Sequence, residues 1–276
     1  MLHGRADLHC HTTASDGTFT PEQLVQEAAR RGLAAIAVTD HDSVDGVEAS
    51  LDAGDSLGVT VVGGVEISTD VDDGEIHVLG YFVDVHHEPF LKLLYEQRES
   101  RLRRVELMLE KLARLGVNLE ISDVLAVAEP GASVGRPHVA SAMIRGGYVT
   151  SWDEAFSRYI GRRAPAYVPR SKLTPHEAVQ AILEAGGVPV MAHPGLVNND
   201  HMIPSLVESG LKGIEVVYPD HSPAQQRHYQ ALARQYGLVA TGGSDCHGPR
   251  SKSGVMLGTS TVDVSVVEEL RRQAVQ

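Results

Sequence analysis

The chain has 276 residues, 42% of them hydrophobic, a size that suits one large domain or one domain with an insertion. Its formal net charge of −12 argues against a broad duplex nucleic-acid surface, which needs a basic patch, but not against a small anionic substrate held by cations. No apolar run reaches the roughly 18 residues that span a bilayer and no secretory pattern opens the chain, so we expect a cytoplasmic protein without membrane contact.

Short apolar strands alternate with amphipathic helices along most of the chain. Thr20-Pro21 and Thr174-Pro175 are clear helix starts, because threonine can cap a helix and proline suits its first turn. Buried strands alternating with helices predict a parallel sheet covered by helices. The expected strands are Arg5–His9, Ala34–Val38, Val59–Val62, Ile76–Phe82, Val188–Ala192, Gly213–Tyr218 and Leu238–Thr241.

The stretch 89–163 breaks this alternation. Apolar residues keep helical spacing from Phe90 to about Gly116, and further helices are expected from Arg136 towards Gly146 and over Trp152–Ile160. The first of these helices is strongly basic on its other face. We expect an all-helical insertion that packs over one end of the sheet domain.

Histidine and carboxylate side chains collect at the ends of the expected strands. Alternation along the first strand places His9 and His11 on one face, with Asp16 on the following loop, which is half of a metal site. Two histidines on a solvated face would be the simpler interpretation. Yet ligand-type side chains recur at or just past other strand ends, and in a parallel β/α barrel those ends meet at one mouth. His77 fits less well, because it lies early in its strand. The other candidates are His41, Glu66, His193, Asp245 and His247.

Four motifs resemble those of the PHP (polymerase and histidinol phosphatase) family of metal-dependent phosphoesterases. They are Asp7-Leu8-His9-Cys10-His11, Thr39-Asp40-His41-Asp42, Ala192-His193-Pro194-Gly195 and Gly243-Ser244-Asp245-Cys246-His247. The resemblance covers nearly the whole chain and is strongest to nucleoside 3′,5′-bisphosphate phosphatases, some of which are also 5′→3′ exoribonucleases. It implies an α/β fold, a distorted (β/α)7 barrel of the PHP type formed by 1–88 and 164–276, with 89–163 as the helical insertion.

The resemblance also implies a site for three divalent metal ions. His9, His11, Glu66 and Asp245 would hold the first ion; Glu66 would bridge to the second, completed by His77 and His193; Asp16, His41 and His247 would hold the third. Manganese is the expected ion, with iron and zinc as alternatives. Asp7, Asp40 and Asp42 are expected to orient imidazole rings through their second nitrogen.

The expected reaction is hydrolysis of a nucleotide phosphomonoester. A 3′,5′-bisphosphonucleotide would give a nucleoside 5′-monophosphate and phosphate, with removal of nucleotides from the 5′ end of short RNA as an added activity. A metal-activated water would attack phosphorus, and His221 and Asp245 are the candidate proton donors to the leaving oxygen.

A bisphosphate substrate needs a second anion-binding group away from the metals. Arg136, just before a proline-started helix, is the best candidate, and His138 would assist. Arg101 shares a helix face with Arg104 and could reach the mouth, although such a charge run more often faces solvent.

Two other functions stay open at this point. One is hydrolysis of histidinol phosphate or another small phosphomonoester on the same site. The other, of a different class, is a non-catalytic metal-bound module that acts with a polymerase or another partner; the complete ligand set counts against it. Cys10 and Cys246 are expected to be reduced packing residues, because each lies between two candidate ligands on an extended segment.

Overall fold

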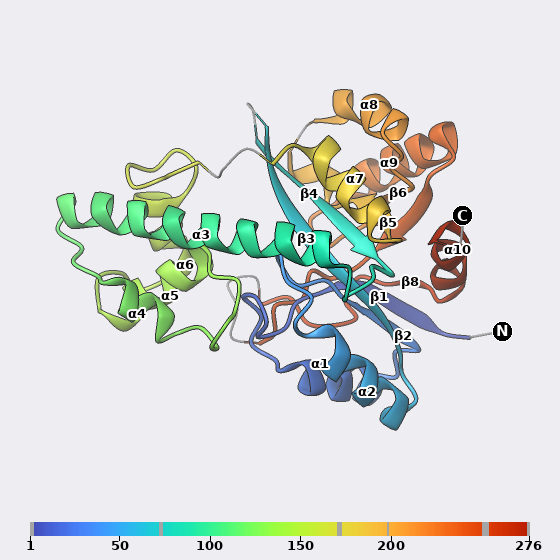
Figure 1. The fold of residues 1–276 in the computed structure, drawn as a ribbon, viewed down its shortest axis with the longest axis horizontal. Helices are drawn as coiled ribbons and strands as arrows, with labels where there is room; N and C mark the ends of the chain where they lie inside the picture. The colour runs from blue at the N-terminus through green and yellow to red at the C-terminus, as the bar shows by residue number, and fades with distance from the viewer. Residues whose placement is uncertain (1–2, 72–73, 170–172, 198, 250–253, 275–276) are drawn as a thin grey trace.

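The computed structural model describes residues 3–71, 74–169, 173–197, 199–249 and 254–274. Eight strands form one sheet in the order β7-β6-β5-β4-β3-β2-β1-β8, which curls into a nearly closed barrel (Figure 1). A bridge between Cys10 and Cys246 brings the end of β1 next to the segment after β7. The strands are β1 (Arg5–Cys10), β2 (Ala35–Val38), β3 (Thr60–Val71), β4 (Gly74–Tyr81), β5 (Val188–Met191), β6 (Gly213–Val217), β7 (Val239–Gly242) and β8 (Val262–Asp263). The predicted α/β barrel is therefore confirmed, and β8 is an additional short strand antiparallel to β1.

One strand runs against the expected parallel direction. β4 pairs antiparallel with both β3 and β5. The connection between β3 and β4 is only two residues long, whereas a parallel pair needs a crossover of a dozen residues or more. Because β4 is reversed, its first residues lie at the end of the barrel where β3 and β5 finish. His77, near the start of β4, therefore reaches the same mouth as residues at the ends of other strands.

Helices cover the outside of the barrel, with α1 and α2 on one side and α7, α8 and α9 on the other (Figure 1). Thr20, Thr174 and Ser222 each accept a hydrogen bond from a backbone N–H in the first turn, and the side chain there returns it, which stabilises each helix start by about 1 kcal/mol. These helices are α1 (Pro21–Arg30), α2 (Val47–Leu57), α7 (Pro175–Glu184), α8 (Ile203–Glu208), α9 (Pro223–Tyr236) and α10 (Ser265–Ala274). Short 3₁₀ turns cover Pro194–Leu196 and Asp200–Met202.

A buried apolar cluster lies at the end of the barrel away from the ligand-bearing strand ends. Leu8, Val190 and Val239 contribute to it from β1, β5 and β7, and α10 closes it with Val267 and Leu270. These residues precede the candidate ligands along the same strands, so rigid packing lies directly below the mouth. Cys10 and Cys246 are buried free thiols.

The segment expected to be an insertion is helical and has a core of its own. Val105, Leu112, Val139 and Met143 belong to a cluster separate from those of the barrel, whereas the first turns of α3 pack against the barrel core. In Figure 1 these helices lie beside the barrel, joined to it by the long α3. Its elements are α3 (Glu88–Arg114), the unexpected α4 (Ile121–Leu125), α5 (Arg136–Arg145), α6 (Trp152–Ala155) and a π-helical turn over Phe156–Ile160. Within the described residues, no helix has the length and apolarity to cross a bilayer.

Candidate metal centre

Nine side chains, which we call the ligand cluster, meet at one mouth of the barrel. His9 and His11 come from the end of β1, Asp16 from the loop after it, His41 from the end of β2, Glu66 from β3, His77 from β4, His193 from the turn after β5, and Asp245 and His247 from the segment after β7. The residues predicted to be metal ligands thus lie within reach of one another. Their role as ligands is taken up below as a proposal.

Glu66 lies at the centre of the ligand cluster and is almost fully buried. Burial alone would raise the pKa of its carboxyl, but the surrounding imidazoles, His41 first, hold that pKa well below its usual range. Glu66 Oε1 lies 2.8 Å from His77 Nδ1 and 3.0 Å from His193 Nε2, and Oε2 lies 2.9 Å from His41 Nδ1, 3.4 Å from His11 Nε2 and 3.5 Å from His9 Nε2. Both oxygens of this carboxylate therefore lie among imidazole nitrogens, a combination of donor atoms that suits divalent cations.

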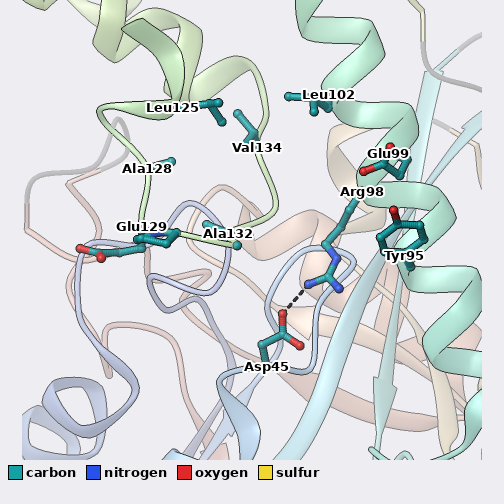
Figure 2. A pocket seen from close by; sticks show the side chains of 12 residues that line it. Asp45, Tyr95, Arg98, Glu99, Leu102, Leu125, Ala128, Glu129, Ala132 and Val134 are labelled. Atoms are coloured by element: carbon teal, nitrogen blue, oxygen red, sulfur yellow. Dashed lines mark hydrogen bonds and ion pairs between the residues drawn. The ribbon is translucent and has the colours of Figure 1, made fainter. Parts of the chain in front are cut away.

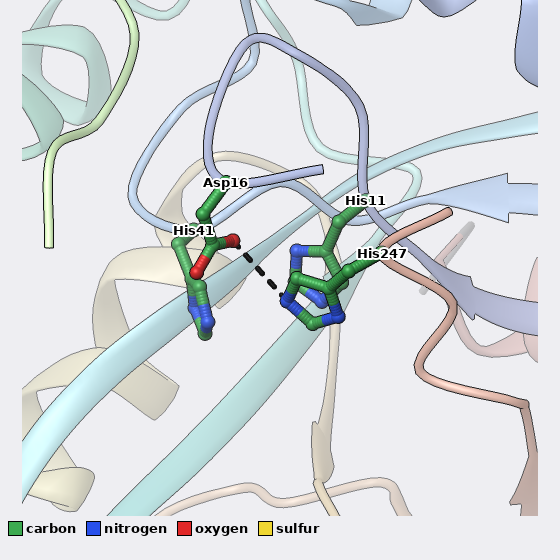
Figure 3. A group of neighbouring side chains, drawn as sticks. All are labelled: His11, Asp16, His41 and His247. Atoms are coloured by element: carbon green, nitrogen blue, oxygen red, sulfur yellow. Dashed lines mark ion pairs between the residues drawn. The ribbon is translucent and has the colours of Figure 1, made fainter. Parts of the chain in front are cut away.

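The ligand atoms fall into three overlapping groups, within each of which all atoms lie within 4.8 Å of one another. The groups are His9, His11, Glu66 and Asp245; His11, Asp16, His41 and His247; and His41, Glu66 and His77. Figure 3 shows the second group, in which Asp16 Oδ1 lies 3.2 Å from His247 Nε2. Burial opposes a charged ring there, but Asp16 and Asp245 raise the pKa of His247 to about 10. The first group is the set of residues expected to hold the first ion. The second group adds His11 to the set expected for the third ion, and the third group contains His41 in place of the expected His193.

Buried atoms without hydrogen-bond partners test whether these residues fit a metal. Within the described part of the chain, six atoms of the ligand cluster are buried and have no hydrogen-bond partner: His9 Nε2, His11 Nε2, Asp16 Oδ1, Glu66 Oε2, His193 Nδ1 and Asp245 Oδ1. Several of these atoms lie close to one another without forming a hydrogen bond, as Asp245 Oδ1 does at 3.0 Å from His11 Nε2. Buried polar atoms without hydrogen bonds are costly, and a cation between them would satisfy them directly. Imidazole nitrogen with carboxylate oxygen suits manganese, iron and zinc. The residues therefore fit a cluster of divalent ions.

Glu215, which the sequence analysis missed, orients two members of the ligand cluster. It is fully buried on β6. His9 Nδ1 donates to its Oε1 over 3.1 Å, and the His193 backbone N–H donates to Oε2 over 2.7 Å. Because the carboxylate can only accept, His9 carries its proton on Nδ1 and presents Nε2 to the cluster. The sequence did contain a signal for this role, because Glu215 is an acidic residue inside an otherwise apolar strand.

Asp7 and Asp40 hold backbone segments, which corrects the expectation that they orient imidazole rings. Asp7 accepts from Ser244 N (2.8 Å), Ser244 Oγ (2.6 Å) and Gly258 N (2.7 Å). Asp40 accepts from the backbone and hydroxyl of Thr12 (2.7 and 2.6 Å) and from Ser15 Oγ (2.6 Å). Both carboxylates thus fix the loops that carry ligands.

Arg101, a predicted substrate contact, is buried and therefore does not lie on the solvated helix face that was the alternative. Its Nε donates to Asp42 Oδ2 over 2.5 Å and its Nη2 to Ser68 Oγ over 2.7 Å. Asp42 is itself buried and also accepts from the Ser68 backbone N–H over 3.0 Å. Arg104, one turn further along α3, is buried as well and donates to the Val168 carbonyl over 2.7 Å. Arg101 therefore joins α3 to the loop after β2, a structural contact.

Arg136 begins α5 and points towards β4. Its Nη2 lies 3.1 Å from Glu75 Oε1 and 2.9 Å from Oε2, and Arg104 Nη2 lies 3.3 Å from Oε1. We call Glu75, Arg104 and Arg136 the arginine–glutamate group. His138 accepts from the Gly135 backbone N–H over 3.1 Å and is buried, so it caps the start of α5.

His221 and Asp245, the two candidate proton donors, have different surroundings. His221 Nδ1 donates to the Val216 carbonyl over 3.0 Å and its Nε2 accepts from the Gly195 N–H over 3.1 Å, so both ring nitrogens bond to backbone and a structural role is favoured. Asp245 Oδ2 accepts from Tyr218 over 3.0 Å, while its side chain stays 20% exposed beside the ligand cluster.

Four described residues at or just after strand ends have the left-handed backbone conformation that non-glycine residues rarely adopt. They are Asp42 (φ 49°), Phe82 (φ 58°), His193 (φ 27°) and Asp245 (φ 52°), and two of them, His193 and Asp245, belong to the ligand cluster. Such backbone costs of the order of 1–3 kcal/mol at each residue and is typical of functional sites.

A separate cavity of about 620 Å³ lies between α3 and the segment that connects α4 to α5 (Figure 2). It is lined partly by Leu102, Leu125 and Tyr95, and Arg98 pairs with Asp45 at its edge. Its lining includes none of the ligand cluster.

Comparison with known proteins adds the family context. A family model described as the PHP domain matches residues 7–118. The chain is 34% identical to the 5′-3′ exoribonuclease Rnm of Escherichia coli, over 88% of this chain and 85% of that protein. It is also 34% identical to a phosphoribosyl 1,2-cyclic phosphate 1,2-diphosphodiesterase of Eggerthella lenta, over 88% and 94% of the two chains.

Two further matches agree with these. A 3′,5′-nucleoside bisphosphate phosphatase of Chromobacterium violaceum is 30% identical, over 88% of this chain and 87% of that protein. A Bifidobacterium adolescentis protein, solved under the description of a metal-dependent phosphoesterase, superimposes with a TM-score of 0.91 at 32% identity, covering 97% and 96% of the two chains.

Proposed function

The chain belongs to the PHP family and is a metal-dependent phosphoesterase, and from this we propose that its substrate is a nucleoside 3′,5′-bisphosphate. It would release the 3′ phosphate and leave a nucleoside 5′-monophosphate. The same site would remove nucleotides from the 5′ end of short RNA. We propose that the nine residues of the ligand cluster hold three divalent ions, with manganese as the preferred metal.

The observation that carries this proposal is the set of six buried, unpartnered ligand atoms around Glu66. They converge from segments far apart in the chain, and a hydrogen-bonded core would not leave so many unsatisfied. When bound, the metals would neutralise phosphate oxygens and lower the pKa of a water molecule to near 7.

The protein's own residues prepare the site for that chemistry. Glu215 fixes the tautomer of His9, and Tyr218 holds one oxygen of Asp245 so that the other faces the cluster. Asp245 is the more exposed of the two candidate proton donors, so we propose that its carboxylate takes the proton released by the attacking water and passes it to the leaving oxygen.

The second phosphate would bind at Arg136. This residue lies at the N-terminus of α5, where backbone N–H groups favour an anion, and 18% of its side chain is exposed. Its partner Glu75 lies two residues before His77, on the same face of β4, so the site adjoins the ligand cluster. Arg101 is excluded from this role by its buried pairing with Asp42.

A cyclic phosphodiester is the second candidate substrate. The Eggerthella lenta relative that is named for this reaction is as similar to the chain as the exoribonuclease is. Opening a cyclic phosphate uses the same metal chemistry, and the separate phosphate of a phosphoribosyl group would also be a terminal phosphate for Arg136.

A phosphate-release screen with added Mn²⁺ tests these assignments. It compares adenosine 3′,5′-bisphosphate with 3′-AMP, 5′-AMP, histidinol phosphate and phosphoribosyl 1,2-cyclic phosphate, and phosphorus NMR detects opening of the cyclic compound. We expect the bisphosphate to have the highest kcat/KM, and His193→Ala to lose turnover while its circular dichroism spectrum is retained. Faster turnover of histidinol phosphate or of the cyclic compound would overturn the substrate assignment. Parent-level activity in His193→Ala would remove His193 from the ligand cluster.

A further inference from the structure

Glu75 is bound as an anion by two arginine side chains. Arg136 Nη2 contacts both carboxylate oxygens, at 3.1 and 2.9 Å, and Arg104 Nη2 lies 3.3 Å from Oε1. The three side chains are 15%, 18% and 6% exposed, so the group is shielded but can still be reached from solvent. A carboxylate in this setting makes the contacts that a phosphate oxygen would make.

The two guanidinium groups are held in place independently of Glu75. Arg104 donates through Nε to the Val168 carbonyl over 2.7 Å. The Tyr167 ring lies 5.5 Å from the guanidinium carbon of Arg104 and 5.7 Å from that of Arg136, and Phe156 lies 5.8 Å from the latter. Stacking and backbone bonding pre-organise the arginines, so Glu75 can leave without disordering them.

Glu75 lies directly beside the ligand cluster. Its Oε2 lies 4.0 Å from His77 Nε2. An anion that replaced this carboxylate would therefore be next to a phosphate bound at the cluster, as the two phosphates of one small molecule would be. Asp42 offers a contrast, because its carboxylate is only 2% exposed beside Arg101, whereas that of Glu75 is 15% exposed.

We propose that Glu75 occupies, in the substrate-free protein, the place of the substrate's second phosphate. Binding is then an exchange, in which a terminal phosphate displaces Glu75 from Arg136 and Arg104. A phosphate dianion competes well against a singly charged carboxylate, whereas a diester or a hydroxyl group does not. Glu75 is thus a specificity-determining residue that selects for a second terminal phosphate. This inference rests on the proposed function.

The variant Glu75→Gln tests the exchange, because it removes the competing charge and keeps the shape. We expect KM for adenosine 3′,5′-bisphosphate to fall by about tenfold, with kcat and the KM for 3′-AMP within about twofold of the parent. Inhibition by 5′-AMP, which carries only the second phosphate, should tighten by a similar factor. The matched control is Glu27→Gln, which removes an arginine-paired glutamate on α1 and should change none of these constants.

A double variant isolates the contact. In an Arg136→Met background, Glu75→Gln should no longer lower KM for the bisphosphate. The inference is overturned if Glu75→Gln raises KM for the bisphosphate, leaves it unchanged, or alters both substrates equally. Failure of the proposed function looks different, because no phosphate is then released from any nucleotide by the parent protein. In that case calorimetry of 5′-AMP binding still decides the exchange: tighter binding to Glu75→Gln supports it, and equal binding overturns it.

Discussion

The ligand cluster and the arginine–glutamate group lie side by side at the barrel mouth, but they differ in whether their polar atoms have hydrogen-bond partners. In the cluster, six buried atoms have no hydrogen-bond partner within the described residues. In the neighbouring group, Arg104 and Arg136 already bind an anion of the protein itself. The difference teaches that a site with unsatisfied polar atoms can bind an ion without losing an internal contact, whereas a satisfied site can bind a ligand only by giving one up.

The largest effect is expected at the centre of the unsatisfied site. Glu66→Gln removes the charge that faces five imidazoles, so we expect bound metal to be lost and kcat to fall by about 10³-fold or more. Metal analysis of the purified protein and a phosphate-release assay measure both. Parent-level metal content in this variant would show that Glu66 is not a ligand.

The next largest effect separates Arg101 from the exchangeable arginines. Arg101→Met leaves Asp42 charged and buried, so we expect the free energy of unfolding to fall by about 3–5 kcal/mol. Urea unfolding measures this. Arg98→Met on the same helix removes a more exposed pair with Asp45 and should cost about 1 kcal/mol or less. Equal losses in the two variants would mean that the Arg101 pair is not a structural contact.

A smaller effect is expected at Glu215, which orients His9 but is not itself part of the ligand cluster. Glu215→Gln keeps the shape of the side chain but weakens the hold on His9, so metal affinity should fall by about 10–100-fold. Metal titration of activity measures this, and saturating Mn²⁺ should restore turnover, which it should not do for Glu66→Gln. Metal affinity equal to that of the parent would show that Glu215 does not tune the site.

The smallest effect is expected in the satisfied group. Arg136→Lys loses the planar fork but keeps the charge, so we expect KM for adenosine 3′,5′-bisphosphate to rise by about tenfold. The KM for 3′-AMP should stay within about twofold. A parallel rise for both substrates would place Arg136 outside the second anion site.

Much of this architecture was predictable because its signals are local. Capping residues such as Thr20 and Thr174 define helix starts by contacts within one turn, and histidines at successive strand ends predict a common mouth once the sheet closes. The direction of β4 followed from the two-residue connection before it, which apolar periodicity does not register. His77 therefore seemed misplaced only while β4 was taken to be parallel.

The contacts that sequence reasoning missed depend on segments far apart in the chain. The charge pattern of α3 is that of a solvated face, and only the approach of Asp42, Ser68 and Val168 buries Arg101 and Arg104. Glu215 stood alone in an apolar strand, without a nearby histidine to suggest its role. Such pairings arise from tertiary structure, which single-sequence patterns do not encode.

The left-handed backbone at His193 and Asp245 has a consequence for the evolution of this barrel. Each residue has a backbone conformation that glycine adopts without strain. A descendant freed from selection for catalysis would thus gain heat resistance by discarding these two side chains. At those two positions, thermal stability and catalysis therefore favour different residues.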